Sequence, residues 1–322
     1  MKAWRLVAAL VLLCVVAVVG MGIGARHVPA GEVVRALLAY NGSPDHIVVL
    51  DLRGPRAVLA IAVGAALAVA GVLIQTITRN PLGEPGILGV TAGSSFAVVV
   101  GSVLGVSSQY SDLLLAIVGA AVASVLVYSV GRVSPLRLVL TGSALTFVLS
   151  GCTTGLQLLF PHALDKYRYW HVGSLAGREQ QPNLVPLLVI AVSLVGALLI
   201  SRQLNAVALG DTVAQTLGAK VQRVRFAALV LVTVLSGAAT ALAGPILFVG
   251  LMVPHLARQL AGASVGWMIG FAAVLGPVLL LIADIGSRVL LPTGEVPVAI
   301  VMAFLGGPVL IWAARRYGRV EA

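Results

Sequence analysis

Long apolar runs separated by short polar interruptions fill nearly the whole sequence and constrain its fold more than any other feature. A bilayer core about 30 Å thick needs roughly 20 apolar residues per helix, and it forces backbone groups to hydrogen-bond within the protein. About ten such runs occur, of which the third and the eighth are only weakly separated from their neighbours. Their approximate ranges are 6–24, 56–76, 86–104, 112–130, 138–160, 184–202, 223–243, 246–261, 267–288 and 297–314. We therefore predict an all-α, polytopic transmembrane helical bundle with a single domain, residues 1–322.

The composition excludes a water-facing surface over most of the chain. Hydrophobic residues make up 59% of the sequence and charged residues 10%, whereas soluble domains carry about 25% charged residues. The net charge of +10 comes from cations that are scattered singly or in pairs between apolar runs, without interleaved aromatic residues. A groove that follows a nucleic-acid backbone needs a continuous basic surface, so no nucleic-acid partner is expected.

The positions of the cations indicate the orientation, because Lys and Arg next to short loops favour the cytoplasmic side. With both termini in the cytoplasm, 13 of the 21 basic residues lie inside and eight outside. The inner residues are Lys2, Arg5, Arg79, Arg132, Arg137, Arg202, Lys220, Arg223, Arg225, Arg258, Arg315, Arg316 and Arg319. The outer residues are Arg26, Arg35, Arg53, Arg56, Lys166, Arg168, Arg178 and Arg288. So many external cations need an explanation of their own.

The segment 78–86, between the second and third spans, is polar and rigid. It contains two prolines and two glycines, which impose a non-helical path. Such a path is tolerated in a membrane only where the backbone is buried in protein or faces water. The segment is either an ordinary tight loop or a loop at the inner mouth of a pathway.

The segment 204–219 is the longest cytoplasmic insertion and is too polar to span. Val213 and Leu217 fall on one helical face and Asp211 and Gln215 on another, and Gly218 follows as a stop. This spacing predicts a short amphipathic helix. Because its polar face has no Lys or Arg before Lys220, attraction to anionic lipid is weak and docking to a protein partner is favoured.

Two ionisable positions near span ends are interpreted as structural. His255 follows Pro254, and no second His or carboxylate lies at ligand spacing, so metal binding is not expected. Asp284 and Arg288 are four residues apart and share a helix face, which favours an ion pair. Arg288 has the alternative of reaching outward, close to Arg53 and Arg56.

Several catalytic patterns are missing from the sequence. No Lys follows a Gly, so there is no phosphate-binding P-loop, and no His-Glu-x-x-His, Gly-x-Ser-x-Gly or Cys-x-x-Cys occurs. We therefore predict that the chain is not an enzyme, has no cofactor of its own and does not hydrolyse ATP.

Taken together, these polar segments resemble the FecCD family, the permease subunits of bacterial ABC importers for iron-siderophore complexes, haem and vitamin B12. The resemblance runs in order over nearly the whole chain. Its segments are Leu-Arg-Gly-Pro-Arg (52–56), Asn-Pro-Leu-Gly-Glu-Pro-Gly-Ile-Leu-Gly (80–89), 170–177, 209–218, 248–258, 283–284, 295–297 and 306–308. It implies a BtuC-like type II importer fold of ten helices in a bacterial inner membrane.

The resemblance also implies partners. The subunit would form a homo- or heterodimer with a substrate path along the dimer axis, above two cytoplasmic ATPase subunits that bind ATP and Mg²⁺. An extracytoplasmic substrate-binding protein would present acidic residues to arginines of the permease, at positions matched by Arg53, Arg56 and Arg288. Because exposed ion pairs contribute up to about 1 kcal/mol each, we expect them to orient this partner more than to hold it tightly.

Two further groups of residues match functional positions of the family. Leu209, Gly210, Asp211, Leu217 and Gly218 match the coupling helix that contacts the ATPase. Asn80 and Leu82 match the inner gate, and Pro135 and Leu136 occupy the other gate position. At that position the vitamin B12 permease has small hydroxyl residues. The sequence departs there, and again at Arg178-Glu179-Gln180, where a second Trp is frequent.

The alternatives that remain open concern mechanism and substrate. An ion-coupled secondary transporter also uses inverted repeats, of which the chain shows a faint echo around residues 56–88 and 225–250. Such transporters keep carboxylates near the membrane midplane, whereas the Asp and Glu residues here lie in loops or at span ends. An iron-siderophore complex is favoured over haem or vitamin B12, although no residue specifies the ligand.

Overall fold

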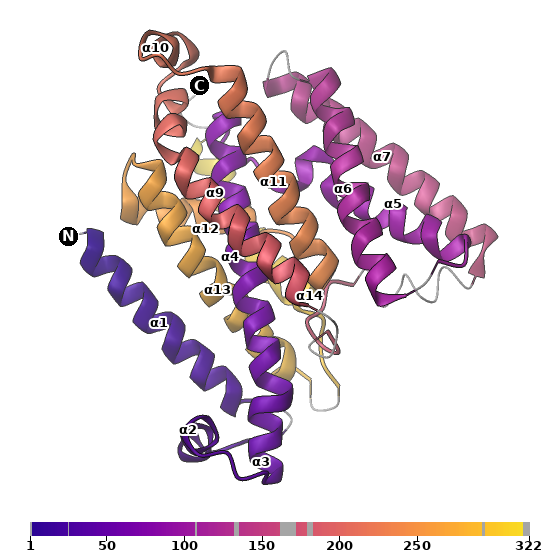
Figure 1. Ribbon diagram of the computed structural model, residues 1–322, viewed down its shortest axis with the longest axis vertical. Helices are drawn as coiled ribbons and strands as arrows, with labels where there is room; N and C mark the ends of the chain where they lie inside the picture. Colours follow the sequence, from indigo (N-terminus) through magenta and orange to yellow (C-terminus); the bar gives the residue numbers. More distant parts are fainter. Residues whose placement is uncertain are drawn as a thin grey trace.

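The computed structural model describes residues 2–24, 26–106, 108–131, 135–161, 172–178, 183–291 and 294–317, and over these residues it contains helices and no strands. Figure 1 shows a bundle of long helices with short helices at both ends. The helices are α1 (Lys2–Gly22), α2 (Ala30–Leu38), α3 (Pro44–Ile47), a π-helical turn (Val48–Arg53), α4 (Gly54–Thr78), a 3₁₀ turn (Pro85–Leu88), α5 (Val90–Val103), α6 (Gln109–Gly131), α7 (Pro135–Leu159), α9 (Leu184–Ala208), α10 (Asp211–Thr216), α11 (Val221–Ala243), α12 (Val249–Ala261), α13 (Val265–Val289) and α14 (Val298–Tyr317).

Each of the ten predicted spans overlaps one α-helix, which confirms the all-α transmembrane class. Seven helices in the described part of the chain are long and apolar enough to cross a membrane. The third and eighth predicted spans correspond to α5 and α12, which have only 14 and 13 residues. At 1.5 Å per residue each is about 20 Å long, short of the bilayer core. Their separation in the sequence is weak because non-helical segments precede them.

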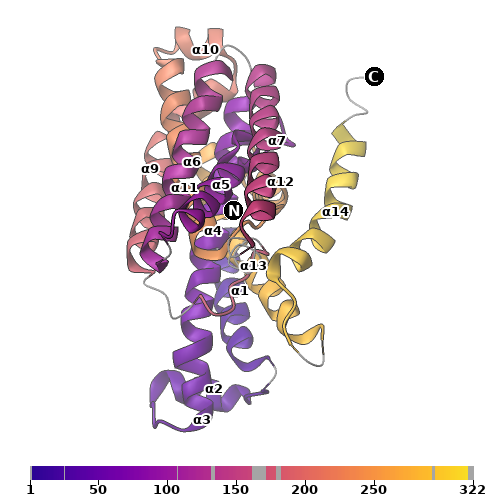
Figure 2. The same ribbon diagram turned by 90° about the vertical axis from the view of Figure 1, so that its right-hand side faces the viewer.

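Helix α4 is the centre of the bundle. It is buried over most of its length and packs against α13, α11, α12 and α9 (Figures 1 and 2). Glycines allow this close packing: a Cβ at Gly71 would lie 2.0 Å from the carbonyl oxygen of Gly250, and one at Gly64 would lie 2.7 Å from that of Gly276. Small residues at helix contacts are the usual device for tight packing in membranes, where no hydrophobic force drives helices together.

The short helices mark the two ends of the bundle. Both views place α2 and α3 at one end and α10 at the other (Figures 1 and 2). Helices α5, α6 and α7 form a group beside α11 (Figure 1). The polar residues near α2 and α3 therefore lie at one end of the bundle, and those near α10 lie at the other end.

Candidate functional site

Two non-helical segments meet in the interior of the bundle. The first, residues 79–89, leads from α4 into α5, and the second, residues 244–248, leads from α11 into α12. A carboxylate oxygen of Glu84 accepts a hydrogen bond of 2.7 Å from the backbone N–H of Phe248. This bond joins the two segments that showed the faint internal echo in the sequence. It also satisfies an N–H group at the start of α12, which would otherwise lack a helical partner.

The segment 79–89 has a fixed path. The Asn80 side-chain oxygen accepts from the Leu82 N–H at 2.9 Å, and the Asn80 carbonyl accepts from the Gly83 N–H at 3.0 Å. The buried side-chain amide of Gln75 donates to the Gly83 carbonyl at 3.2 Å. Burial raises the pKa of the Glu84 carboxyl above its usual range, and the hydrogen bond from Phe248 partly opposes this effect. Sequence reasoning missed Gln75 because it lies inside an apolar run.

A cavity of about 580 Å³ opens beside this meeting point, between α5 and α7. It is lined largely by hydroxyl and amide side chains. Its polar lining residues are Glu84, Thr91, Ser95, Ser143, Thr146, Ser150, Thr153, Thr154 and Gln157. Six of them follow one another along α7 at helical spacing, so that one side of this helix is polar. The sequence signal for this face is the series of Ser and Thr residues three and four apart within the span.

Hydroxyl oxygens lining this cavity retain unused hydrogen-bonding capacity. The Ser95 side chain is 4% exposed, and its oxygen has no hydrogen-bond partner among the described residues. Thr146 and Thr153 donate their hydroxyl hydrogens to carbonyls of their own helix, at 2.8 and 2.7 Å, but their oxygens remain acceptors. The cavity therefore offers neutral donors and acceptors with a single carboxylate. Such a surface suits a polar solute with many oxygen atoms.

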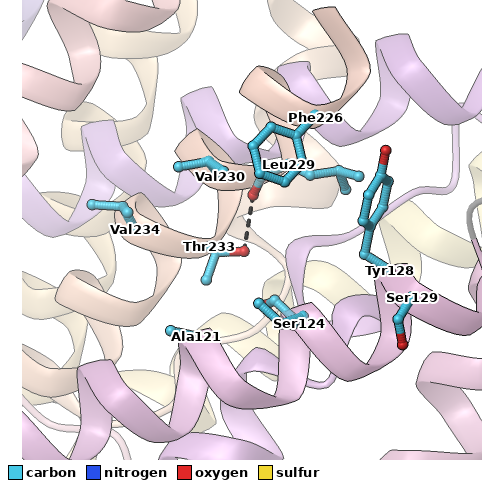
Figure 3. Close-up of a pocket in the computed structure, with 10 residues that line it drawn as sticks. Ala121, Ser124, Tyr128, Ser129, Phe226, Leu229, Val230, Thr233 and Val234 are labelled. Carbon is cyan, nitrogen blue, oxygen red and sulfur yellow. Dashed lines mark hydrogen bonds between the residues drawn. The ribbon is translucent and has the colours of Figure 1, made fainter. Parts of the chain in front are cut away.

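A second hollow, of about 430 Å³, is chemically different. Figure 3 shows it between α6 and α11, with Tyr128 beside Phe226; the other lining residues are aliphatic except for the hydroxyl residues Ser124, Ser129 and Thr233. The Tyr128 and Phe226 ring centroids are 5.7 Å apart, and the Thr233 hydroxyl donates to the Leu229 carbonyl at 2.8 Å. Since the lining is mostly hydrocarbon, this groove suits an apolar chain and not a polar chelate. The candidate path for a polar solute is the cavity between α5 and α7.

At the end that carries α2 and α3, two of the three arginines predicted as docking residues, Arg56 and Arg288, belong to a buried ionic cluster. Arg56 contacts Asp284 and Glu295, each at 2.8 Å, and Arg288 contacts Asp284 at 3.0 Å. Arg53 donates to the backbone carbonyl of Met21 at 2.7 Å. The predicted pair of Asp284 and Arg288 is confirmed.

The expectation of exposed arginines is wrong for Arg56 and Arg288, whose residues are 8% and 7% exposed. The physical reason is that a buried carboxylate, Asp284, provides the counter-charge for both guanidinium groups. Arg288 also donates to the carbonyls of Gly20 and Ile23, at 2.9 and 2.7 Å, and so ties α1 to α13. Arg53 is the only one of the three that is not buried.

At the opposite end, α10 is the short helix predicted within 204–219. It begins after Gly210 and is followed by Gly218, and both glycines have positive φ, at 118° and 79°. Ala214 is the buried residue of this helix, while Val213 and Leu217 are exposed. The predicted amphipathic face therefore points away from the bundle.

Leu209, directly before the helix, is exposed as well, so that Leu209, Val213 and Leu217 form an outward apolar surface. Asp211 points back to the bundle. Its carboxylate contacts Arg79 at the end of α4 and Arg225 on α11, the latter at 3.0 Å. Sequence reasoning missed both arginines as partners of Asp211. Arg79 is 132 residues away and Arg225 is 14 residues away, so neither lies at a local helical spacing from it.

The remaining predicted residues are placed as follows. Asn80 and Leu82 lie half-buried in the segment 79–89, whereas Pro135 and Leu136 begin α7, where Leu136 is exposed. Among the described residues, no hydrogen bond or ion pair joins Asn80 or Leu82 to Pro135 or Leu136. His255 is buried on α12, with its Nδ1 2.8 Å from the Leu251 carbonyl oxygen, as expected for a structural residue. Trp170, Glu179 and Gln180 lie outside the described residues.

Comparison with known proteins extends these observations to the whole chain. A model of the FecCD transport family matches residues 10–316. The ferric enterobactin transport system permease protein FepD of Escherichia coli (strain K12) is 45% identical over 316 residues, which are 96% of this chain and 94% of FepD. The iron(3+)-hydroxamate import system permease protein FhuB of Bacillus subtilis (strain 168) is 37% identical over 321 residues, which cover 98% of this chain and 83% of FhuB.

A solved structure shows a similar fold. An inward-facing metal-chelate type ABC transporter has a TM-score of 0.84 and 28% identity with this chain, covering 98% of this chain and 99% of its own. The likeness therefore covers nearly the whole chain.

Proposed function

The chain belongs to the FecCD transport family, and on this premise we propose that it is the membrane permease subunit of an ATP-binding-cassette importer for iron-siderophore complexes. The observation that carries the proposal is the hydroxyl-lined cavity between α5 and α7. Polar side chains within a membrane are costly unless a polar solute, water or protein covers them. A permease for a hydrophilic chelate needs such a surface, with neutral donors and acceptors that bind weakly enough to release the solute.

The substrate class follows from the same lining. A siderophore encloses its iron in oxygen donors, so the permease meets the organic exterior of the complex and needs no metal ligands of its own. Among the described residues, no group of three or more His, Cys, Asp or Glu residues is placed to hold a metal ion. FepD, named for ferric enterobactin transport, is 45% identical to this chain, which supports an iron chelate over haem or vitamin B12.

We propose that the outward apolar surface of Leu209, Val213 and Leu217 contacts a cytoplasmic ATPase subunit. Leu209 and Leu217 are about two-thirds exposed, at 68% and 66%, and flank a helix too short to be stable alone. Exposed apolar side chains on such a helix are typical of a surface that a partner covers. This partner would bind ATP and Mg²⁺, and a dimeric permease would carry two of them. With α10 in the cytoplasm, both termini lie on the cytoplasmic side of the inner membrane.

The end that carries α2 and α3 is the proposed docking surface for an extracytoplasmic binding protein. Arg53 is half-buried and is the member of the predicted trio that can meet an acidic partner directly. Arg56 and Arg288 lie beneath it and would support this surface through their pairs with Asp284. Charged residues at the rim of an interface mainly affect the rate at which the partner associates and its orientation.

An uptake assay tests the proposed function. The permease is reconstituted in vesicles with its ATPase. The binding protein is added after it has been loaded with ferric enterobactin, which serves as the probe. We expect uptake that requires ATP and survives collapse of the proton gradient. Uptake that disappears with the gradient and ignores ATP would instead identify an ion-coupled secondary transporter.

A variant pair tests the path. Ser143→Ala combined with Ser150→Ala removes two cavity hydroxyls from α7 and should lower the uptake rate about tenfold, as expected for the loss of about 1.4 kcal/mol of transition-state interaction. Ser129→Ala is the matched control, because Ser129 lines the apolar groove between α6 and α11. Equal uptake by the double variant and the control would show that the cavity is not part of the substrate path.

A further inference from the structure

The Asp211 carboxylate is shared by two arginines that belong to different parts of the bundle. One carboxylate oxygen contacts Arg79, which follows α4, and Arg225, which lies in the first turns of α11. Arg79 also donates to the Val207 carbonyl, at the end of α9, at 3.0 Å. The start of α10 is therefore connected to three long helices through one carboxylate and two guanidinium groups.

Arg79 occupies a position from which movement reaches the segment 79–89 directly. It ends α4 in the left-handed conformation, with φ of 51°, which is unusual for a residue other than glycine. Residues held in this region are strained and persist only where neighbouring contacts enforce them. The next residue is Asn80, whose side chain and carbonyl hold Leu82 and Gly83. Because these hydrogen bonds fix the turn, a shift of Arg79 moves residues 80–83 together.

The rigid turn continues to the cavity. Gly83 is followed by Glu84, which accepts from the Phe248 N–H and also lines the cavity. Phe248 has φ of 71°, and with Arg79 it is one of the two described residues other than glycine with positive φ. One chain of contacts thus joins the two strained positions, Arg79 and Phe248. This chain runs from α10 through the Asp211 pair and the turn at residues 79–84 to the start of α12.

The exposure of the three side chains suggests which contact changes. Arg225 is 17% exposed and held against α11, whereas Arg79 and Asp211 are each 41% exposed. Pairs with this exposure to water form and break at little cost, while a more buried partner stays in place. Asp211 can therefore keep Arg225 while its contact with Arg79 is made or lost.

We propose that Asp211 is a positioning residue that transmits movement of α10 to the inner gate through Arg79, and that its role is separate from holding the ATPase. The proposal rests on the proposed function, because it requires an ATPase that moves α10. The outward residues Leu209 and Leu217 hold that partner, and Asp211 on the inward side links its movement to the segment that contains Asn80 and Leu82. Loss of Asp211 then separates ATP hydrolysis from transport without detaching the ATPase.

The test uses the complete transporter in vesicles and measures uptake per ATP hydrolysed. Asp211→Asn should leave copurification of the ATPase and the hydrolysis rate within about twofold of the unaltered protein. Uptake per ATP should fall about fivefold or more, the lower end of typical coupling between sites. Asp211→Glu keeps the carboxylate and should restore most of the coupling. The melting temperature should not change, because the pair is partly exposed.

A second variant identifies the partner. Arg79→Gln should reproduce the loss of coupling, and the double variant Asp211→Asn with Arg79→Gln should be no worse than either single change, since both remove one contact. Normal uptake per ATP in Asp211→Asn would overturn the proposal, and so would loss of the ATPase from that variant. Unaltered protein that shows no ATP-dependent uptake would instead refute the proposed function.

Discussion

The ionic cluster around Asp284 should stabilise the bundle, and replacing Asp284 by Ala measures by how much. Asp284 is 2% exposed, and it contacts the side chains of Arg56 and Arg288, which are 9% and 6% exposed. Its removal leaves two buried guanidinium groups side by side. Arg56 would retain Glu295, and Arg288 would retain the carbonyls of Gly20 and Ile23. Breaking a buried pair by removing one partner typically costs about 3–5 kcal/mol, because the remaining charge is left uncompensated.

This free energy converts to a melting temperature. Unfolding entropies average about 2.1 cal/mol/K per residue, or about 0.7 kcal/mol/K for a chain of this length, so the variant should melt roughly 4–7 °C lower. The assay is thermal unfolding of the purified subunit in detergent, in the absence of any partner. The control is Asp45→Ala, which breaks the pair of Asp45 with Arg26, whose side chains are 32% and 57% exposed. It should shift the melting temperature by less than about 2 °C.

Equal melting of the two variants would refute the reasoning. The three arginines would then act only when a binding protein docks, and the close contacts to Asp284 would contribute nothing to folding. Asp284→Asn refines the comparison, because it keeps the size and shape of the side chain and removes its charge. It should melt close to Asp284→Ala if charge compensation, and not packing, is the dominant contribution.

Two further predictions concern helix packing and the proposed ATPase surface. Gly71→Ala places a methyl group 2.0 Å from the Gly250 carbonyl and should lower the free energy of unfolding by about 1–3 kcal/mol, whereas Gly270→Ala on α13 meets open space and should be neutral or slightly stabilising by thermal melting. Leu217→Asp puts a charge into the proposed apolar contact and should reduce copurification of the ATPase at least tenfold without changing the melting temperature of the isolated subunit. Equal melting of the two glycine variants, or full recovery of the ATPase with Leu217→Asp, would contradict these two statements.

The positions of the helices were predictable because the information is local. The bilayer sets a minimum length of apolar sequence, and Gly or Pro residues mark where a helix ends, so the ten ranges and the short helix α10 followed from the sequence. Gly218 with its positive φ is an example, because only the residue type was needed to predict the end of that helix. The half-length of α5 and α12 was less accessible, since the few residues directly before each helix, 86–89 and 246–248, are apolar and extend the apolar run beyond the helix.

Contacts between distant residues could not be predicted in the same way. Arg56 and Asp284 are 228 residues apart, and Glu84 and Phe248 are 164 apart, so no local pattern pairs them. The sequence placed Arg56 and Arg288 near the outer end, but whether they are exposed there depends on which helices surround them. That decision comes from the packing of α1, α4 and α13.

The sequence by itself therefore determined that this chain is a multi-pass helical membrane protein, and it placed the polar interruptions along it. The tertiary structure decided which of these interruptions meet, which arginines are buried, and which side of α7 faces the cavity. The physical reason is that bilayer thickness acts on each apolar run separately. The rotation and partners of a helix depend instead on packing against its neighbours, and within a membrane hydrophobicity does not distinguish one face from another.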